Sequence, residues 1–453
     1  MSARDAPLVN PRLVRSYDLR GEVGTDLTDA DARALGLSYA AALQGRRRVA
    51  VGYDGRLSSA ALESALVDRL VAGGAQVERI GLGPTGMLYH AVHSRDLDGG
   101  IMITGSHNPP DQNGFKLLLG KEPVFGEALA DLVRRRGEER AGGIVRNAPV
   151  FHDYVERLVA ASDAAPALRI GWDPGNGAAG DVLARLVERL PGEHRIINGA
   201  IDGHFPAHHP DPSVPGNLAQ LQALVCEKRL DLGIAFDGDG DRIGVVDAQG
   251  EILWPDQLVL LLGQDLLRSQ PGASIVADVK SSRVLFDGIA AAGGRPVMAP
   301  SGYVLIRQAM LREGAPMAGE MSGHIFFADQ WTGTDDALHV AMRLLAALGR
   351  IDLPGFRATL PRTVATPELR LPCPDARKQE ILAAVAAGID GPIDRTDGLR
   401  VTRPEGWWLL RASGTEPKLT ARIEAWDKSR LETLRADLFG RLAKAGLEPR
   451  SSC

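Results

Sequence analysis

The segment Leu232-Gly-Ile-Ala-Phe-Asp237-Gly-Asp-Gly-Asp241-Arg242 contains the clearest indication of the chain's architecture. Its apolar run, 232–236, predicts a buried β-strand, and the glycine-rich acidic loop after it predicts an abrupt end to that strand. The same order occurs at Gly100-Ile-Met-Ile-Thr104 before Ser106-His-Asn108, and at Ala315-Pro-Met-Ala-Gly319 before Glu320-Met-Ser-Gly-His324. Strand and helix patterns alternate from about residue 48 to 350, which predicts an α/β architecture.

The three loops predict the domain organisation. Ligands collect outside the carboxyl ends of strands in α/β sheets, so we expect the loops to share one cleft. We interpret the chain up to residue 360 as three similar α/β domains, over 1–148, 149–250 and 251–360. Prolines between 354 and 374 mark a boundary. Beyond it a helix at 375–387, strands near Arg400 and at 407–410 and 419–425, and a helix at 429–445 predict an α+β domain over 361–453.

Composition excludes several classes of protein. The 453 residues are 44% hydrophobic and 24% charged, which is the balance of a globular chain and not of a disordered or collagen-like one. A net charge of -5 gives no basic surplus for nucleic acid or an acidic membrane surface. Three widely spaced cysteines, with no long apolar segment and no secretory leader, predict a cytoplasmic protein with free thiols. Only eight of the 52 basic residues are lysines, so a lysine within a motif is informative.

The acidic loop predicts a metal site. Asp237, Asp239 and Asp241 alternate, so in an extended segment their carboxylates project to one side. Oxygen ligands of this kind select Mg²⁺ or Ca²⁺ over zinc, and Arg242 could hold an anion beside the ion. A solvated acidic turn is the alternative. An EF-hand loop is excluded, because its sixth position would be Arg242 instead of glycine.

The other loops offer further chemistry, each with a simpler alternative. Ser106 is a candidate nucleophile or phosphoryl carrier, although serine is also common in turns. Lys116 and Lys280 follow predicted strands and could act on anions or protons, or lie on the surface. The side chains of 320–324 suit sugar hydroxyls, or form a polar turn. The loop Arg411-Ala-Ser-Gly-Thr-Glu-Pro-Lys418 could wrap a phosphate, or be an ordinary hairpin loop.

Two further patterns are interpreted as structural. Gly175-Asn-Gly-Ala-Ala-Gly180, with Asp202 about twenty residues later, fits a dinucleotide fingerprint. Asp173-Pro174 would stiffen the turn and place negative charge near a pyrophosphate, so we do not expect a dinucleotide there. His208-His209 is interpreted as polar loop, because no other ligand stands at metal-site spacing.

Together the loops resemble the α-D-phosphohexomutases, most closely the bacterial phosphomannomutase/phosphoglucomutase branch. The matching stretches are Tyr17–Gly21, Gly52–Arg56, Thr104–Pro110, Asp202–Pro206 with His208–Pro212, Asp237–Arg242, Gly319–His324 and Arg411–Pro417. The resemblance implies a monomer of four domains around a central cleft, with a C-terminal domain similar to TATA-binding-protein folds.

The resemblance also implies a role for each matching residue. Ser106 would be the phosphoserine and would share Mg²⁺ with Asp237, Asp239 and Asp241. Arg242 and Lys116 would hold the phosphoryl group, and Lys280 or Lys116 would move a proton. The residues implied in substrate binding are Tyr17, Arg20, Tyr303, Glu320, Ser322, His324, Arg411, Ser413, Gly414 and Thr415.

The implied reaction is reversible phosphoryl transfer between C1 and C6 of a mannose or glucose phosphate, with hexose 1,6-bisphosphate as intermediate and activator. A small phosphosugar would be the partner, with no nucleic acid and no membrane. Phosphoglucosamine mutase is an alternative, although Met321 stands where those enzymes tend to have Gln. A non-catalytic phosphosugar-binding protein and a serine phosphohydrolase are the others. Three residues depart from the family pattern, namely Tyr303 for His, Gly414 for Asn and Leu19 for Ile.

Overall fold

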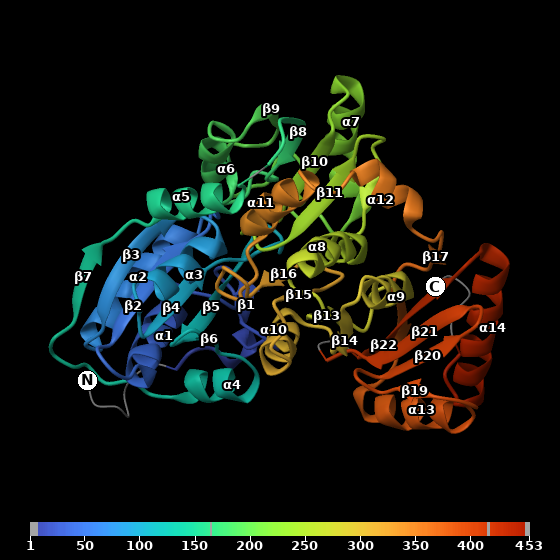
Figure 1. The fold of residues 1–453 in the computed structure, drawn as a ribbon. Helices are drawn as coiled ribbons and strands as arrows, with labels where there is room; N and C mark the ends of the chain where they lie inside the picture. The colour runs from blue at the N-terminus through green and yellow to red at the C-terminus, as the bar shows by residue number, and fades with distance from the viewer. Residues whose placement is uncertain (1–7, 164, 415–416, 449–453) are drawn as a thin grey trace. The chain divides into compact units, whose positions relative to one another are not determined.

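The computed structural model describes residues 8–163, 165–414 and 417–448, which form two compact units (Figure 1). The first unit contains the chain up to Leu258 together with Ser322–Asp352, and the second contains Val259–Met321 together with the chain from Leu353 onward. The chain therefore leaves the first unit within helix α8 (Pro255–Ser269), returns at Ser322 and leaves again after Asp352.

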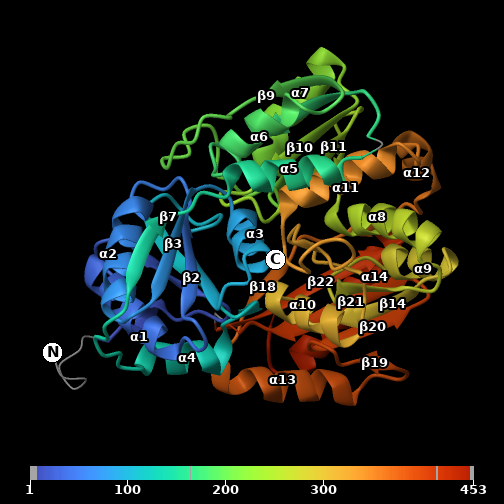
Figure 2. The ribbon, with the colours of Figure 1, turned by 60° about the vertical axis from the view of Figure 1, so that its left-hand side comes forward.

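The N-terminal domain is built on a seven-stranded sheet of order β1-β5-β4-β2-β3-β7, with β6 beside β5. Its strands are β1 (Leu19–Glu22), β2 (Arg48–Tyr53), β3 (Gln76–Leu82), β4 (Gly99–Ile103), β5 (Gln112–Leu119), β6 (Glu122–Pro123) and β7 (Ile144–Asn147). Strands β4, β2, β3 and β7 are parallel, whereas β5 is antiparallel to β4 and β1. The helices are η1 (Pro11–Leu13), α1 (Asp29–Ala42), α2 (Ser59–Ala72), α3 (Thr85–Ser94) and α4 (Gly126–Arg134). Figure 2 shows α1 and α2 on one face of the sheet and α3 on the other.

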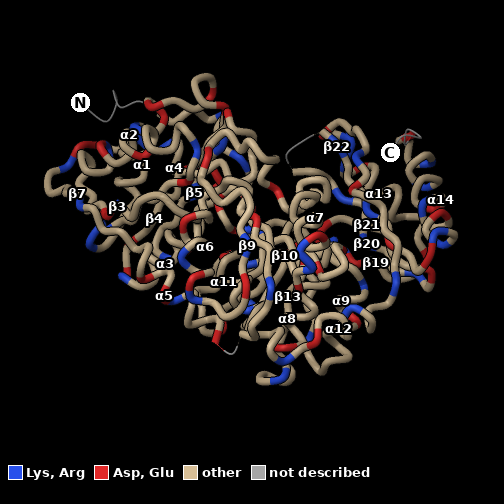
Figure 3. The backbone as a smooth tube through the Cα atoms, turned by 90° about the horizontal axis from the view of Figure 1, so that it is seen from above, with Lys and Arg blue, Asp and Glu red and all other residues tan. Residues whose placement is uncertain are grey.

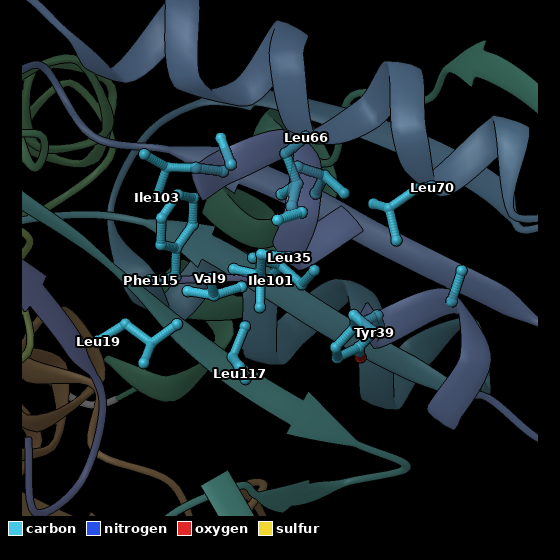
Figure 4. Packing of buried hydrophobic residues seen from close by; sticks show 14 of the residues in the cluster. Val9, Leu19, Leu35, Tyr39, Leu66, Leu70, Ile101, Ile103, Phe115 and Leu117 are labelled. Atoms are coloured by element: carbon cyan, nitrogen blue, oxygen red, sulfur yellow. The ribbon is translucent and has the colours of Figure 1, made fainter. Parts of the chain in front are cut away.

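Leucines on α2 explain why this segment is a helix and which face it buries. Leu62, Leu66 and Leu70 recur every fourth residue and are at most 1% exposed, so they form one apolar stripe. Figure 4 shows Leu66 and Leu70 among the residues that pack with Ile101 of β4. Each leucine contributes about 2 kcal/mol through burial. The helix ends before Gly74, whose φ of +81° turns the chain toward β3.

The second α/β domain has a five-stranded sheet of order β12-β11-β10-β8-β9. Its strands are β8 (Leu168–Asp173), β9 (Gly192–Ile196), β10 (Leu232–Phe236), β11 (Ile243–Asp247) and β12 (Ile252–Leu253). Its helices are α5 (Phe151–Ala161), α6 (Gly180–Val187), η2 (Pro215–Leu218), α7 (Ala219–Lys228) and α11 (Ala337–Leu348). Strand β10 is buried along its whole length and runs parallel to β8, so the loops after both strands leave the same edge.

The second unit begins with three parallel strands, in the order β14-β13-β15. They are β13 (Ser274–Asp278), β14 (Arg295–Ala299) and β15 (Met317–Gly319), and the helices between them are α9 (Arg283–Ala291) and α10 (Tyr303–Arg312). Asp278 pairs with Ala299, and Ala277 with Gly319, so the loops after these strands begin at one edge. Strand β16 (Ile325–Phe327) lies in the first unit.

The C-terminal domain follows helix α12 (Leu353–Thr359) and has an antiparallel sheet of order β17-β22-β21-β20-β19, with β18 beside β22. Its strands are β17 (Val364–Ala365), β18 (Leu369–Pro372), β19 (Ile393–Asp394), β20 (Leu399–Arg403), β21 (Gly406–Ala412) and β22 (Lys418–Ala425). Helices α13 (Asp375–Ala387) and α14 (Lys428–Lys444) complete the domain. Leu434, Leu438 and Leu442 of α14 recur every fourth residue and belong to its core, while Figure 3 shows basic and acidic residues along the same helix.

Three α/β domains and a C-terminal domain with an antiparallel sheet confirm the predicted fold class. Across the described part of the chain, no helix has both the length and the hydropathy that membrane crossing requires.

Candidate active site

Ser106 follows β4 in a loop whose backbone is unusual at the serine itself. Its φ is +47°, a left-handed conformation that non-glycine residues rarely adopt, and the residue is only 3% exposed. Ser106 Oγ donates a hydrogen bond to Asp237 Oδ2 at 2.7 Å and lies 3.1 Å from His107 Nδ1. The serine hydroxyl of the first domain therefore meets the acidic loop of the second.

The acidic loop joins β10 to β11 and buries Asp237, Asp239 and Asp241 almost completely. One ligand oxygen from each carboxylate lies within 4.8 Å of the others, which confirms that the alternating aspartates converge. Asp237 Oδ1 accepts the backbone N–H groups of Asp241 and Arg242, at 3.0 and 3.1 Å, and this closes the loop. Gly240, with φ +71°, makes the turn possible.

Lys116 supplies positive charge to this loop from β5. Its Nζ donates to Asp239 Oδ2 at 2.7 Å and also pairs with Asp241 Oδ2. Thr85, at the start of α3, donates a further hydrogen bond from Oγ1 to Asp239 Oδ2 at 2.7 Å. Ser106 follows β4 and Lys116 lies on β5, which pairs with β4 in the antiparallel sense, so both side chains reach the acidic loop.

The carboxylates differ in charge environment. Burial, together with the charges of Asp241 and Asp239, raises the pKa of Asp237 well above its ordinary value. Burial also opposes ionisation of Asp241, but Lys116 and His324 outweigh it and hold the pKa of Asp241 well below the ordinary range. Burial and the charges of Arg242 and Arg20 lower the pKa of His107 to about 2, so this ring is neutral beside Ser106.

His324 and Asp335 extend the site on the side of Asp241. His324 Nε2 lies 3.3 Å from Asp241 Oδ1, and its Nδ1 is 2.8 Å from Ser322 Oγ. Burial and the charge of Asp241 raise the pKa of Asp335 to about 7. Arg242 Nη1 lies 3.6 Å from Asp211 Oδ1. Asp241 therefore lies beside a histidine and a second buried carboxylate.

The donor set of this loop suits a hard divalent cation. Asp239 Oδ1 is buried and has no hydrogen-bond partner among the residues that the structure describes. A carboxylate oxygen in that condition is costly unless a cation faces it. Asp237, Asp239 and Asp241 offer oxygen ligands, whereas a second group, formed by Asp241, His324 and Asp335, mixes oxygen and nitrogen. The first group matches the chemistry of Mg²⁺ or Ca²⁺.

Arg20 and Tyr17 lie in the first unit. Arg20, on β1, donates from Nε to Asp18 Oδ2 at 2.8 Å and is 8% exposed. Burial, the charge of Arg242 and then that of Arg20 lower the pKa of His107, and against the effect of burial Lys116, with a smaller contribution from Arg20, lowers the pKa of Asp239. Tyr17 is half-buried, with its ring centroid 6.5 Å from that of Phe125.

A second cluster, in the second unit, is centred on Asp278 at the end of β13. Asp278 is buried and accepts hydrogen bonds from Ser281 Oγ at 2.8 Å and Ser301 Oγ at 2.9 Å. Met321 N–H also donates to Asp278, at 3.3 Å, and Lys280 Nζ lies 3.9 Å from it. Asp278 therefore contacts the loops that follow β13, β14 and β15.

Two predicted substrate residues of the second unit, Glu320 and Arg411, connect to the same cluster. Glu320 Oε1 accepts the N–H of Gly302, next to Tyr303, at 3.1 Å. Arg411 Nη2 lies 2.9 Å from Asp397 Oδ2, which also accepts the N–H of Ser301 at 3.2 Å. The unit boundary falls between Met321 and Ser322, so Glu320 and Ser322 belong to different units.

The candidate phosphate loop is described in part. Ser413 N–H donates to Lys418 O at 3.1 Å, and Ser413 O accepts from Lys378 Nζ at 2.7 Å. Gly414 is exposed, and Thr415 lies outside the described residues.

Comparison with known proteins decides the family. Four models of phosphoglucomutase/phosphomannomutase match this chain: α/β/α domain I over residues 11–140, domain II over 152–250, domain III over 254–354 and the C-terminal domain over 368–441. The chain is 40% identical to phosphomannomutase/phosphoglucomutase of Pseudomonas aeruginosa over 447 residues, which is 96% of each protein. The chain belongs to the phosphoglucomutase/phosphomannomutase family. Membership makes it an enzyme with phosphohexomutase activity.

Other members of the phosphoglucomutase/phosphomannomutase family agree over nearly the full length. Phosphoglucomutase of Neisseria gonorrhoeae is 39% identical over 435 residues, covering 93% of this chain and 95% of that protein. A crystal structure of a phosphoglucomutase/phosphomannomutase family protein from Burkholderia thailandensis superimposes with a TM-score of 0.90 at 37% identity, covering 97% of this chain and 98% of that one.

The mutase fold gives the glycine pattern at 175–180 a structural role. Ala178 N–H donates to Gly238 O at 2.9 Å, so this loop packs directly on the acidic loop. A Cβ at Gly177 would lie 2.8 Å from the same Gly238 oxygen. His208 Nε2 lies 2.9 Å from Asp173 Oδ2, as part of the polar loop expected at that position.

Several residues of this family member's site were not predicted. His107 and Thr85 contact the serine or the acidic loop, Asp335 lies 3.9 Å from His324, and Asp278 and Asp397 organise the second cluster. His107 and Asp278 stand within or beside the predicted loops, so their position was a usable signal. Thr85 and Asp397 follow no motif, and only the tertiary structure reveals them.

Proposed function

We propose that this enzyme interconverts hexose 1-phosphate and hexose 6-phosphate, of mannose, glucose or both, through a phosphorylated Ser106. The observation that carries the proposal is the 2.7 Å hydrogen bond from Ser106 Oγ to Asp237 within a buried carboxylate cluster that also holds Lys116. A buried serine beside neutralising cations and metal-ligand oxygens suits a phosphoryl carrier. The names of the relatives supply the sugar class.

In the proposed reaction the free 6-hydroxyl of a hexose 1-phosphate attacks phosphorus on Ser106. The new P–O6 bond forms as the P–Oγ bond breaks, and the hydroxyl proton passes to Lys280, because Lys116 already donates to Asp239 and Asp241 as an ammonium group. The resulting 1,6-bisphosphate turns over in the site, Ser106 Oγ attacks its 1-phosphoryl group, the P–O1 bond breaks, and the proton held by Lys280 passes to O1. Hexose 6-phosphate leaves, and the serine is phosphorylated again.

The residues around the serine supply binding and charge. Lys116 and Arg242 would hold the phosphoryl oxygens, and neutral His107 would donate from Nδ1 to Ser106 Oγ, whose own proton is donated to Asp237. Asp237, Asp239 and Asp241 would hold Mg²⁺, which when bound neutralises negative charge on the transferring group. Substrate binding and proton transfer are carried out by side chains of the protein.

Recognition of the sugar and its second phosphate is assigned to the remaining residues. Glu320, Ser322 and His324 would bind sugar hydroxyls, and Arg411, Ser413, Gly414 and Thr415 the phosphate that is not reacting. Tyr303, Tyr17 and Arg20 would assist in binding substrate. The ordinary pKa of tyrosine is about 10, whereas that of the histidine in the family pattern is about 6.5. We therefore assign hydrogen bonding to Tyr303 in place of proton transfer.

The test is turnover combined with intact mass. The enzyme is incubated with glucose, mannose or glucosamine 1-phosphate, Mg²⁺ and a trace of bisphosphate. We expect 6-phosphates of glucose or mannose, and loss of more than about a thousand-fold in rate for Ser106→Ala. The mass of one phosphoryl group should be present in wild type and absent from the variant. Ser162→Ala, which removes a hydroxyl that donates to Val159 O, is the control and should retain both.

Other outcomes identify the alternatives. Turnover of glucosamine phosphate alone would assign the enzyme to that substrate. Release of inorganic phosphate without isomerisation would indicate a phosphohydrolase, and binding without turnover a phosphosugar-binding protein. A phosphoryl group that persists on Ser106→Ala would show that another residue is the carrier.

A further inference from the structure

Two sequence stretches that the proposed chemistry does not use meet beneath the serine loop. Arg56 follows β2, in the stretch Gly52–Arg56, and Phe205 belongs to the loop 202–206 of the second domain. The side chain of Arg56 is 0% exposed, which is unusual for an arginine and requires that its charge and donors be satisfied inside the protein.

The guanidinium of Arg56 donates hydrogen bonds to several backbone carbonyl groups of the serine loop. Nη2 donates to Ser106 O at 2.7 Å and to Asn108 O at 2.6 Å. Nη1 donates to Pro109 O at 2.5 Å and to Gln112 O at 2.8 Å. One planar group therefore ties together four carbonyls spread over seven residues, three of them in the loop between β4 and β5 and the fourth on Gln112, the first residue of β5.

Asp54 fixes the orientation of this guanidinium. Its Oδ2 lies 3.2 Å from Arg56 Nε and also accepts the N–H of Gly105 at 3.1 Å. Its Oδ1 accepts Ser59 Oγ at 2.5 Å and the N–H of Arg56 at 3.0 Å. A Cβ at Gly105 would lie 2.3 Å from Arg56 Nε, so the backbone before the serine rests directly on the arginine.

The loop of the second domain covers Arg56 from the other side. The Phe205 ring centroid lies 5.0 Å from the guanidinium carbon, within the range of a cation–π contact. A Cβ at Gly203 would lie 2.8 Å from both Arg56 Cα and Gly55 O, so the two loops touch along their backbones. The arginine is therefore held between the serine loop, Asp54 and Phe205.

We propose that Arg56 is a positioning residue that holds Ser106 Oγ toward Asp237, and that Asp54 and Phe205 keep Arg56 in place for this task. The left-handed backbone of Ser106 is intrinsically unfavourable and persists only where its surroundings impose it. With four carbonyls drawn onto Arg56, the serine hydroxyl is left facing the acidic loop. The inference rests on the proposed role of Ser106 as phosphoryl carrier.

The proposal requires the shape of arginine and not only its charge. A guanidinium presents five donors in a rigid plane, whereas a lysine ammonium is a point with three donors on a flexible chain. Lysine at this position would keep the positive charge beside Asp54 but release most of the carbonyls. A displacement of the reacting group by about 1 Å costs on the order of a hundredfold in rate.

The test compares Arg56→Lys with wild type by steady-state kinetics and by intact mass after exposure to bisphosphate. We expect kcat to fall about 100-fold while KM for the sugar phosphate stays within about twofold, because the residue positions the carrier and touches no substrate. Phosphorylation of Ser106 should be slowed to a similar degree. The control is Arg47→Lys, since Arg47 Nη2 also donates to two carbonyls of this domain, Ala40 O and Gly73 O, but neither belongs to the serine loop. It should leave kcat unchanged.

Circular dichroism shows whether Arg56→Lys folds. If it does not, Phe205→Leu provides a second test of the inference. Loss of the ring beneath the guanidinium should lower kcat about fivefold with KM unchanged. A folded Arg56→Lys or Phe205→Leu with wild-type kcat, or with KM rising in place of kcat falling, would overturn the inference. If wild-type Ser106 itself never carries a phosphoryl group, the proposed function fails. If wild type is phosphorylated and Arg56→Lys is phosphorylated equally fast, only the role of Arg56 fails.

Discussion

Lys116 places its ammonium group against two carboxylates that are also candidate metal ligands. Asp239 and Asp241 are buried, so their negative charges need a partner inside the protein, and Lys116 is bonded to both. A divalent cation at the same carboxylates would take over part of this neutralisation. The lysine and the cation therefore stabilise the same loop, and the effect of removing one depends on the other.

We predict that Lys116→Met lowers the free energy of unfolding by about 3–5 kcal/mol in EDTA, because it leaves buried carboxylates without their partner. Addition of Mg²⁺ should restore more stability to this variant than it adds to wild type. Chemical unfolding with and without Mg²⁺ measures both effects. Lys121→Met is the control, since Lys121 pairs with exposed Asp96 at 3.4 Å and should cost less than about 1 kcal/mol. A loss that is identical with and without Mg²⁺ would contradict the shared role.

His208 gives the second domain a pH-dependent contact. Its hydrogen bond to Asp173, which is buried, raises the pKa of His208 against the opposing effect of burial. A histidine whose pKa is higher in the folded state contributes stability below its unfolded pKa of about 6.5, and loses it as pH rises through the folded value.

We therefore predict that His208→Gln destabilises the protein more at pH 6 than at pH 9, measured as the difference in unfolding free energy from urea titrations. Asn198→Gly is the matched control. It removes an uncharged donor, 3.1 Å from the other oxygen of Asp173, at a position whose φ of +51° suits glycine. Its cost should be the same at both pH values, and a pH-independent cost for His208→Gln would refute the prediction.

At the scale of elements, the glycine loop between β8 and α6 supports the acidic loop between β10 and β11. A Cβ at Gly177 would lie 2.8 Å from Gly238 O and 2.9 Å from Pro174 O, so two backbones approach each other here without room for a side chain. The position of the acidic loop thus depends on a glycine some sixty residues earlier in the chain.

We predict that Gly177→Ala costs about 1–3 kcal/mol in stability and raises the Mg²⁺ concentration needed for half-maximal activity, because the acidic loop must move away from the new methyl group. Thermal unfolding and a Mg²⁺ titration of activity measure the two effects. Gly216→Ala serves for comparison, since a Cβ at Gly216 meets nothing within 4 Å. Unchanged metal dependence in a destabilised Gly177→Ala would show that the loop does not rely on this contact.

Local patterns predict the elements well and their ends less well. The strand expected at 232–236 and the helix expected at 375–387 have those bounds in the structure. The helix expected at 429–445 instead covers Lys428–Lys444, because Asp427 caps its start by accepting the N–H of Arg430. The strand expected from Ala315 begins at Met317, since Pro316 has no N–H to offer the ladder.

The same limit applies to the site. Ser106 and the three aspartates could be predicted because each stands where a polar loop follows an apolar strand. Arg56 and Thr85 could not, because their roles depend on contacts with loops 50 or more residues away, such as the bond from Thr85 to Asp239. No local periodicity encodes which distant backbone a side chain will meet.

At the scale of the whole molecule, net charge says little about the ligand. Basic and acidic residues are interspersed along the chain (Figure 3), and the total of -5 would not suggest an anionic substrate. What matters is where the cations lie: Lys116 contacts the acidic loop, and Arg242 and Arg20 act on His107 beside Ser106. The domain boundaries after residues 148, 250 and 360, and the monomeric state, stay predictions.

Because the first unit consists of two separate stretches of chain, it cannot complete its fold until late in synthesis on the ribosome. Helix α11, which is buried almost throughout, packs against α5, β10 and β11 but lies beyond the insertion of Val259–Met321. At about 5–20 residues per second, synthesis from Leu258 to Asp352 takes roughly 5–20 s. During that interval the sheet that carries the acidic loop lacks its covering helix, and His324 has not been made for the early part of it. The nascent chain therefore exposes the apolar face of this sheet until α11 has been synthesised and can pack against it.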